Sequence, residues 1–261
     1  MKQALKNLVK SILKKFDIGV TRYSTLQTLC KNVNAGDDIE LLLRLPNQHA
    51  AQLLQNLRKS KSQYRQDLFV LSQLDFKRNG YFVEFGATNG IDISNTYLME
   101  KEFGWNGILA EPARCWHQAL KTNRGAHIET NCVWRDSDSV LDFNEVDNAD
   151  LSTINSFSST AFYKEARKSG KSYDVKTISL NDLLSKYNAP KQIDYLSIDT
   201  EGSELEILNN FDFSKHQFSV ITCEHNFTSM REKIFTLLSS NGYVRQFQEL
   251  SKFDDWYVKS H

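Results

Sequence analysis

The sequence predicts an α/β protein built on a doubly wound, mostly parallel sheet with an antiparallel edge. From about residue 80 onward, short apolar runs rich in β-forming residues alternate with helical stretches. Strands that alternate with helices build a parallel sheet with right-handed crossovers. The expected strands are 81–86, 107–111, 127–134, 193–199 and 218–224. Near the end, YVRQFQEL and FDDWYVKS are two strand-like runs with no helix between them, so we expect an antiparallel pair.

The composition is that of an ordinary folded protein, with 261 residues, 40% hydrophobic and 25% charged. Thirty-two Lys and Arg balance thirty-two Asp and Glu, so no global field favours binding of nucleic acid. No apolar run approaches the length of a transmembrane helix. The cysteines lie far apart with no CxxC spacing, which suits a reducing compartment. We therefore expect a cytoplasmic protein without disulfides or a zinc ribbon; its cysteines are Cys30, Cys115, Cys132 and Cys223.

The N-terminal segment 1–17 predicts a basic amphipathic helix, because apolar residues at helical spacing lie beside a lysine every four residues. We expect this helix to pack on the domain or on a partner subunit, as in a homo-oligomer. The alternative is peripheral contact with the anionic inner face of a membrane. Residues 37–75 predict two or three further helices, interrupted at Pro46. We therefore divide the chain into a helical extension, 1–60, and a larger domain, 61–261.

A glycine loop follows the first expected strand, in the segment Glu84-Phe85-Gly86-Ala87-Thr88-Asn89-Gly90. Gly86 permits a sharp turn, and Gly90 permits close approach of a ligand or helix. The dinucleotide fingerprint GxGxxG fails here, because Glu84 and Asn89 replace its first and third glycines, and the chain has no P-loop. This pattern suits a ligand with an ammonium group and no pyrophosphate. Glu111 ends the second strand, where an acidic side chain can accept hydrogen bonds from ribose hydroxyls.

Six stretches carry a resemblance to a known family: SQYRQDLFV, YFVEFGATNGIDISNT, GILAEP, IDYLSIDTEGSELEIL, ITCEHN and FDDWYV. Through them the chain from about Ser62 to Val258 resembles the FkbM family of S-adenosylmethionine-dependent methyltransferases. The resemblance implies the Rossmann-like class I methyltransferase fold, with strand order 3-2-1-4-5-7-6 and the last strand antiparallel. It also implies methylation of a hydroxyl oxygen, most often on a sugar or polyketide.

The resemblance further implies a binding site for S-adenosylmethionine. Residues of the glycine loop would border the methionine half of the cofactor: Glu84, Gly86, Asn89 and Gly90. Glu111 would hold the ribose, and Asn131, Cys132 and Val133 would lie against the adenine. Gln66, with Asp67, would close over the amino-acid end.

The reacting centre is expected where the fourth and fifth strands end. Asp199 and Glu201 follow one strand, and Glu224, His225 and Asn226 follow the other, so their side chains should meet at one edge of the sheet. A hydroxyl acceptor must lose its proton during methyl transfer, so His225 is a candidate general base. In the other version, which we favour slightly, Asp199 and Glu224 hold Mg²⁺ and make the hydroxyl more acidic. The polar segment Asp147–Thr160 is expected to cover the acceptor.

The leading hypothesis is thus an S-adenosylmethionine-dependent O-methyltransferase acting on a hydroxyl of a carbohydrate or glycoconjugate, with a small-molecule or glycan acceptor and no nucleic-acid partner. One alternative is a catalytically silent relative that serves as a scaffold or a membrane-associated interaction protein. Another is a nucleotide-dependent oxidoreductase, which the broken GxGxxG disfavours.

Overall fold

The computed structural model describes residues 35–146, 151–157 and 165–260. The predicted basic helix at 1–17 lies outside these residues, as do Cys30 and parts of the predicted substrate segment (147–150 and 158–160). The chain divides into two compact units, Met1–Glu40 and Leu41–His261. Residues 41–60 therefore belong to the larger unit, whereas the expected boundary lies after residue 60.

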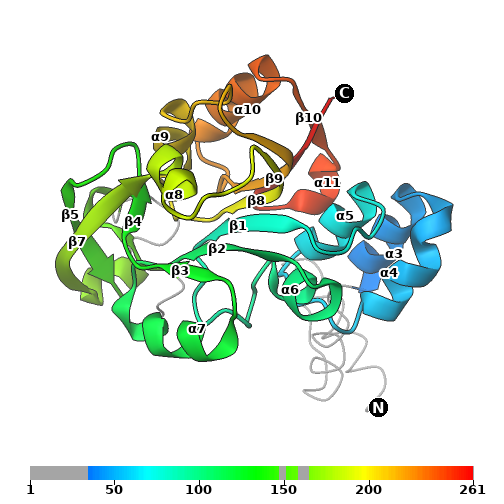
Figure 1. Cartoon of the computed structure of the whole chain (residues 1–261), viewed down its shortest axis with the longest axis horizontal. Helices are drawn as coiled ribbons and strands as arrows, with labels where there is room; N and C mark the ends of the chain where they lie inside the picture. Colours follow the sequence, from blue (N-terminus) through cyan, green and yellow to red (C-terminus); the bar gives the residue numbers. More distant parts are fainter. Residues whose placement is uncertain (1–34, 147–150, 158–164, 261) are drawn as a thin grey trace, which may run out of the picture. The chain divides into compact units, whose positions relative to one another are not determined.

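A seven-stranded sheet forms the centre of the larger unit (Figure 1). Its order is β10-β11-β9-β8-β1-β2-β3, which is 3-2-1-4-5-7-6 when the seven strands are counted along the chain. The pairs from β3 to β9 are parallel, and β11 is antiparallel to both β9 and β10. The prediction of an α/β fold on a mostly parallel sheet is confirmed. The strand bounds are β1 Tyr81–Phe85, β2 Asn106–Ala110, β3 His127–Glu129, β8 Gln192–Ile198, β9 Gln217–Glu224, β10 Tyr243–Gln246 and β11 Asp254–Lys259.

Helices cover both faces of this sheet, because successive strand residues point to opposite sides. On β1, Val83 packs into a core formed with α8, α9 and α10, whereas its neighbour Phe82 packs into a second core with α5 and α6. Both side chains are fully buried. The helix bounds are α3 Ala35–Arg44, α4 Ala50–Asn56, α5 Gln66–Gln73, α6 Tyr97–Phe103, α7 His117–Asn123, α8 Leu180–Lys186, α9 Glu204–Asn209 and α10 Met230–Ser240. Short 3₁₀ turns are η1 Asn47–His49, η2 Arg114–Trp116, η4 Asn155–Phe157 and η5 Ala166–Ser169.

A second, four-stranded sheet was not expected from the sequence. It has the order β4-β7-β5-β6, with bounds β4 Cys132–Trp134, β5 Val140–Glu145, β6 Thr153–Ile154 and β7 Lys171–Ser179. The predicted single strand 127–134 is therefore wrong, because β3 stays in the large sheet and β4 joins the small one. The chain turns after Glu129, whose own carboxylate accepts the backbone N–H groups of Thr130 and Asn131.

The prediction that no helix separates the two C-terminal strands is wrong. A short helix, α11 Gln248–Ser251, separates β10 from β11. Phe247 and Lys252 flank it with φ of 47° and 54°, so two positive-φ residues turn the chain into and out of the helix. The two strands still pair antiparallel, with Arg245 opposite Tyr257.

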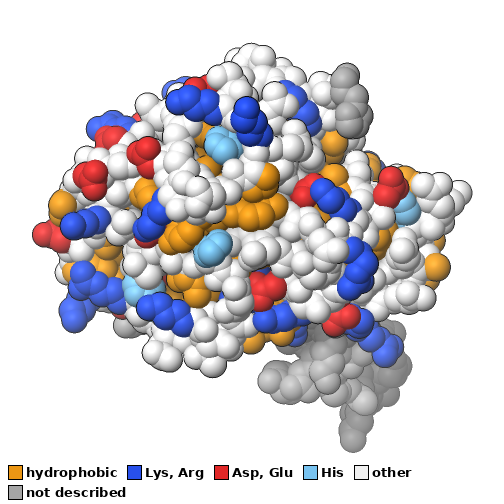
Figure 2. All heavy atoms as spheres, viewed as in Figure 1, with side chains coloured by type: hydrophobic (Ala, Val, Ile, Leu, Met, Phe, Trp, Pro, Cys, Tyr) orange, Lys and Arg blue, Asp and Glu red, His pale blue; other side chains and the backbone are white. Residues whose placement is uncertain are grey.

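The surface of the described residues carries both signs of charge. Figure 2 shows Lys and Arg side chains interspersed with Asp and Glu over the face in view. Within the described part of the chain, no helix combines the length and the apolar run that crossing a bilayer requires.

Candidate active site

A cavity with about 620 Å³ of empty space lies where β1, β2 and β8 end, and the small sheet closes its far wall. Ligands bind at this edge of open α/β sheets. The lining combines backbone at the strand ends, carboxylates and apolar side chains. The main contributors are Gly86, Thr88, Glu111, Cys132, Val133, Phe143, Ile154, Asp199 and Glu201.

The glycine loop allows the main chain to form the floor of this cavity. Gly86 has φ of 72°, and a Cβ placed there would lie 2.1 Å from the carbonyl oxygen of Asp199. Only glycine therefore lets β1 and β8 approach so closely. Gly90 also has positive φ, but it packs against Leu120 and Arg124 and does not line the cavity.

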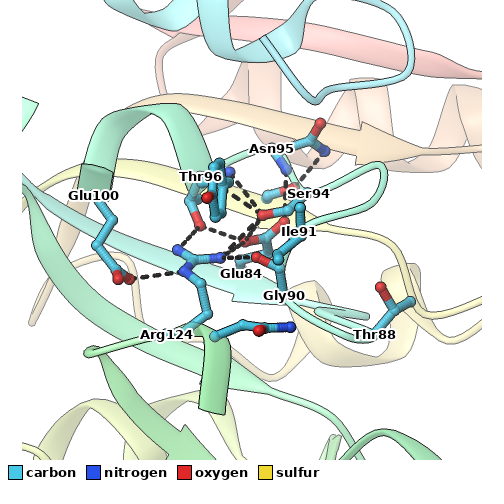
Figure 3. Close-up of polar contacts among 12 residues, drawn as sticks. Glu84, Thr88, Gly90, Ile91, Ser94, Asn95, Thr96, Glu100 and Arg124 are labelled. Carbon is cyan, nitrogen blue, oxygen red and sulfur yellow. Dashed lines mark hydrogen bonds and ion pairs between the residues drawn. The ribbon is translucent and has the colours of Figure 1, made fainter. Parts of the chain in front are cut away.

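Glu84 does not face the cavity, contrary to the prediction that it borders the cofactor. Its carboxylate is buried and accepts hydrogen bonds from the Ser94 hydroxyl (3.1 Å), the Asn95 N–H (2.7 Å) and the Thr96 hydroxyl (Figure 3). These partners all lie at the end of the loop that begins at Gly86. Glu84 therefore fixes the loop and acts on a ligand only through it.

Arg124, which the sequence analysis missed, is the centre of the same network (Figure 3). Its side chain is fully buried, and its Nε donates to Glu100 at 2.8 Å. The other nitrogens donate to the Gly90 carbonyl (3.1 Å), the Ser94 hydroxyl (3.1 Å) and the Thr96 hydroxyl (2.8 Å). One guanidinium thus ties the end of α7 to the whole loop after β1.

Glu111 lies in the cavity wall, where the sequence predicts a ribose-binding residue. One carboxylate oxygen accepts the Thr88 N–H and the other accepts the Ala113 N–H, both at 2.8 Å. A carboxylate oxygen can accept more than one hydrogen bond. The two backbone donors therefore fix the direction of the Glu111 carboxylate in the cavity wall.

The other predicted cofactor residues divide into two groups. Cys132 and Val133 line the cavity from β4, as expected for an apolar wall. Asn131 lies in a separate groove beside Pro112 and does not line this cavity. Asn89 turns back on its own loop, where its side chain accepts the N–H groups of Ile91 and Asp92, so it too is absent from the lining.

A second cavity, with about 380 Å³ of empty space, adjoins the first. Ile93 and Asp199 line both, so they form the partition between them. Gln66 lies in this second cavity, where its amide nitrogen donates to Asp254 at 2.7 Å. The remaining lining residues are Gln63, Tyr64, Asn95, Glu224, Asn226 and Phe253.

Four residues that line the two cavities have a left-handed backbone conformation. Thr88, Ile93, Glu201 and Asn226 all have φ between 44° and 59°. For β-branched residues such as Thr88 and Ile93 this is an unusual conformation. Such strain is retained mainly where function requires a particular geometry.

Three carboxyl groups meet at the partition, as predicted for the ends of the fourth and fifth strands. Asp199, Glu201 and Glu224 each place an oxygen within 4.8 Å of the others. Burial raises the pKa of Asp199 well above its usual value, and the neighbouring Glu201 and Asp254 raise it further. Burial and the Asp199 charge likewise raise the pKa of Glu224. Burial raises the pKa of Glu201 to about 7, although its ion pair with Arg167 at 2.7 Å opposes the shift.

The structure does not place His225 at the reacting centre, where the sequence predicts a general base. Its Nε2 donates to the Asp254 carbonyl at 3.0 Å, and its Nδ1 accepts the Phe227 N–H at 3.0 Å. The ring is buried, and burial lowers the pKa of His225. Both nitrogens are therefore used by the backbone, and His225 joins the loop after β9 to the start of β11.

Part of the predicted substrate segment Asp147–Thr160 is described, and it lies at the first cavity. Ser152 and Ile154 line that cavity. The Thr153 hydroxyl donates to the Glu201 carbonyl at 3.0 Å, so β6 is fixed to the loop after β8. These residues cover the cavity of the expected cofactor rather than the second cavity.

The profile of the Methyltransferase FkbM domain matches residues 84–249, more than half of the chain. The chain belongs to the FkbM methyltransferase family. The FkbM match begins at Glu84 and so includes the glycine loop, Glu111 and the three-carboxyl cluster. This membership supports an S-adenosylmethionine-dependent methyltransferase, as the sequence predicts.

Solved structures share only low similarity with this FkbM protein. A precorrin-6y C5,15-methyltransferase from Geobacter metallireducens has 13% identity and a TM-score of 0.40, over 74% of this chain and 87% of that one. A TehB-like SAM-dependent methyltransferase from Corynebacterium glutamicum has 8% identity and a TM-score of 0.38, over 82% and 97%. No curated protein matches the chain significantly. The family assignment therefore depends on the profile match.

Proposed function

We propose that this chain is an O-methyltransferase that uses S-adenosylmethionine to methylate a hydroxyl of a carbohydrate or glycoconjugate. The observation that carries the proposal is the pair of adjoining cavities that share Asp199 and Ile93. A donor in one cavity and an acceptor in the other would meet at this partition. The proposed location is the cytoplasm, and the proposed partner is a small-molecule or glycan acceptor.

The residues of the first cavity fit S-adenosylmethionine. Gly86 leaves main chain exposed where a Cβ would collide with Asp199, and Glu111 offers carboxylate acceptors suited to ribose hydroxyls. Cys132, Val133 and neighbouring apolar residues give a wall suited to a base. When bound, S-adenosylmethionine supplies a methyl group activated by a sulfonium. Much of the catalysis then consists of holding the acceptor oxygen in line with that methyl group.

The carboxyl groups at the partition deal with the proton of the acceptor hydroxyl. Asp199 faces both cavities, and Glu224 faces the second. Burial and the neighbouring carboxyl groups raise the pKa of Asp199, so its ionised form is a stronger base than an exposed carboxylate. Asp199, paired with Glu224, can therefore take the proton directly.

The same residues fit Mg²⁺, and we favour the metal-assisted version. Asp199, Glu201 and Glu224 supply oxygen ligands within 4.8 Å of one another. The Oε2 atom of Glu224 is buried without a hydrogen-bond partner, which suits a group that binds a cation. A divalent ion there would make the acceptor hydroxyl more acidic.

Two measurements test the proposal. Thermal shift with S-adenosylhomocysteine, NAD or buffer alone should show stabilisation by S-adenosylhomocysteine only, and stabilisation by NAD instead would refute the cofactor assignment. Transfer of labelled methyl from S-adenosylmethionine to a panel of sugars should then be abolished by Asp199→Asn. In the metal-assisted version EDTA also stops transfer and Mg²⁺ restores it. Transfer that survives EDTA would retain the carboxylate base and reject the metal.

A further inference from the structure

One wall of the first cavity is formed by a strand that the small sheet alone holds weakly. Ser152 and Ile154, beside and in β6, line this cavity. β6 is two residues long and lies at the edge of the small sheet, where Ile154 pairs with Phe143 of β5. A two-stranded pairing this short is marginally stable in water. We therefore expect contacts from outside the sheet to hold this part of the wall in place.

Arg167 makes such contacts from η5. Its side chain is 1% exposed, and its Nε donates to the Leu151 carbonyl at 2.9 Å. One Nη donates to the Glu201 carboxylate at 2.7 Å, and the other lies 3.5 Å from the Phe157 carbonyl. Arg167 thus contacts both ends of the segment 151–157 and joins this segment to the loop after β8. A lysine could not make these contacts together, because its ammonium is a single point charge, whereas a guanidinium directs several donors in one plane.

Two further hydrogen bonds make this connection rigid. The carbonyl of Arg167 accepts the side-chain amide of Asn144 at 2.9 Å, so β5 fixes the position of the arginine. The Thr153 hydroxyl donates to the carbonyl of Glu201, so β6 also reaches the loop after β8 directly. Asn144, Thr153 and Arg167 are all buried, and satisfied buried networks of this kind favour a single geometry. The wall therefore takes its position from Arg167 and Glu201 as well as from sheet pairing.

Glu201 belongs to the cofactor side of the partition. It lines the first cavity and not the second, whereas Glu224 lines the second and not the first. The Oε2 atom of Glu201 accepts from Arg167 and, at 3.3 Å, from the side-chain amide of Asn226. This oxygen therefore serves the wall of the first cavity, although Glu201 also lies close to Asp199 and Glu224.

We propose that Arg167 is a positioning residue for S-adenosylmethionine, which holds the β6 wall of the first cavity against the loop after β8 through its ion pair with Glu201. This inference rests on the proposed function and adds a residue that does not itself line the cavity. A wall that is already fixed need not be ordered when the ligand binds. Without Arg167, each binding event would include the free-energy cost of ordering that wall, so affinity for the cofactor would fall.

The test measures ligand affinity and local order separately. Calorimetric titration with S-adenosylhomocysteine gives the affinity, and hydrogen exchange followed by mass spectrometry gives the order of residues 151–157. Because ordering side chains and backbone opposes binding, we expect Arg167→Met to bind S-adenosylhomocysteine about tenfold more weakly. Exchange at 151–157 should be faster in this variant and should return to the wild-type level once the ligand saturates it. Arg167→Lys keeps the charge but not the geometry, so it should show a smaller loss of affinity.

Two comparisons keep the test decisive. Lys168→Ala removes the neighbouring exposed cation of η5, which pairs with Glu165, and should change neither measurement. A double-mutant cycle of Arg167→Met with Glu201→Gln separates action through the ion pair from direct contact of Glu201 with the ligand. If the two residues act as a unit, the double variant should lose less affinity than the product of the two single losses. Arg167→Lys takes the place of Arg167→Met in the cycle if the methionine variant does not fold.

Wild-type affinity for S-adenosylhomocysteine in folded Arg167→Met would overturn the inference even if thermal stability fell, because the residue would then be purely structural. Single losses that multiply in the double variant would also overturn it, since Glu201 would then act on the ligand without Arg167. Failure of the wild-type protein to bind S-adenosylhomocysteine would instead count against the proposed function.

Discussion

Arg124 gives the sharpest prediction about how the loop after β1 is held in place. Arg124→Ala removes four hydrogen bonds, to Glu100, Gly90, Ser94 and Thr96. It also leaves the largely buried Glu100 carboxylate without its guanidinium partner. Breaking a buried ion pair from one side costs about 3–5 kcal/mol, so we expect the free energy of unfolding to fall by that amount.

The same variant should also weaken cofactor binding, although Arg124 does not line the cavity. Gly86 and Thr88 form the cavity wall, and Arg124 holds the later part of their loop in place. Loosening a binding loop adds an ordering cost to binding, so we expect S-adenosylhomocysteine affinity to fall about tenfold. Denaturant unfolding and calorimetric titration measure the two effects, with the exposed Arg135→Ala as the matched control. A loss of stability below about 1 kcal/mol with unchanged affinity would refute the bracing role.

Three further predictions concern the two cavities. Glu111→Ala should weaken S-adenosylhomocysteine binding by about 1.5–3 kcal/mol in a titration, the scale for hydrogen bonds to a charged group, and unchanged affinity would remove Glu111 from the ribose site. Glu224→Gln should keep S-adenosylhomocysteine affinity but lower kcat at least about a hundredfold, since it alters the group that handles the proton or the metal; full turnover would place the active centre elsewhere. Burial raises the pKa of Asp254 to about 7 from 3.8, so the folded state binds an extra proton between these pH values and its stability should fall as pH rises through that window. Asp254→Asn should flatten this slope. At pH 8 it should raise the free energy of unfolding by up to about 4 kcal/mol, and Tm should rise with it; an unchanged pH profile in thermal unfolding would contradict the raised pKa.

Much of the main sheet could be predicted, because its strands and the helices between them each have a clear hydrophobic pattern in the sequence. Short apolar runs mark β1, β2, β8 and β9, and helical spacing fills the intervals between them. The division of 127–134 could not be predicted in the same way. That segment is a continuous β-forming run, and only the hydrogen bonds of the Glu129 side chain to the next backbone N–H groups break it.

The sequence predicts which site residues lie close together where the backbone alone decides it. Asp199 and Glu224 end neighbouring parallel strands, so they had to meet, and Gly86 had to turn the chain beside them. The direction of a ring or carboxylate was not predictable, because it depends on hydrogen bonds made across the fold. His225 follows Glu224 directly, yet its ring is held by the backbone of Phe227 and Asp254.

The role of Arg124 could not be predicted for a different reason. It lies at the end of an ordinary helix, 38 to 40 residues after Glu84 and the glycine loop begin, and nothing in its local pattern marks it as a loop-bracing residue. Its partners are spread over α6 and the loop after β1, so only the folded chain brings them together. A buried arginine with several backbone and hydroxyl partners is recognised by geometry rather than by spacing.

Two polar contacts join the small sheet and the turn before β7 to the loop after β8, and this has a consequence for building chimeras. Thr153 donates to the carbonyl of Glu201, and the buried Arg167 pairs with the carboxylate of the same residue. A graft that exchanges the small sheet for that of another family member would therefore have to carry a matching threonine and arginine. Without the arginine, Glu201 would stay buried beside two other acids and would lose its ion-pair partner. The chimera would then be destabilised at the partition between the cavities rather than within the transplanted strands.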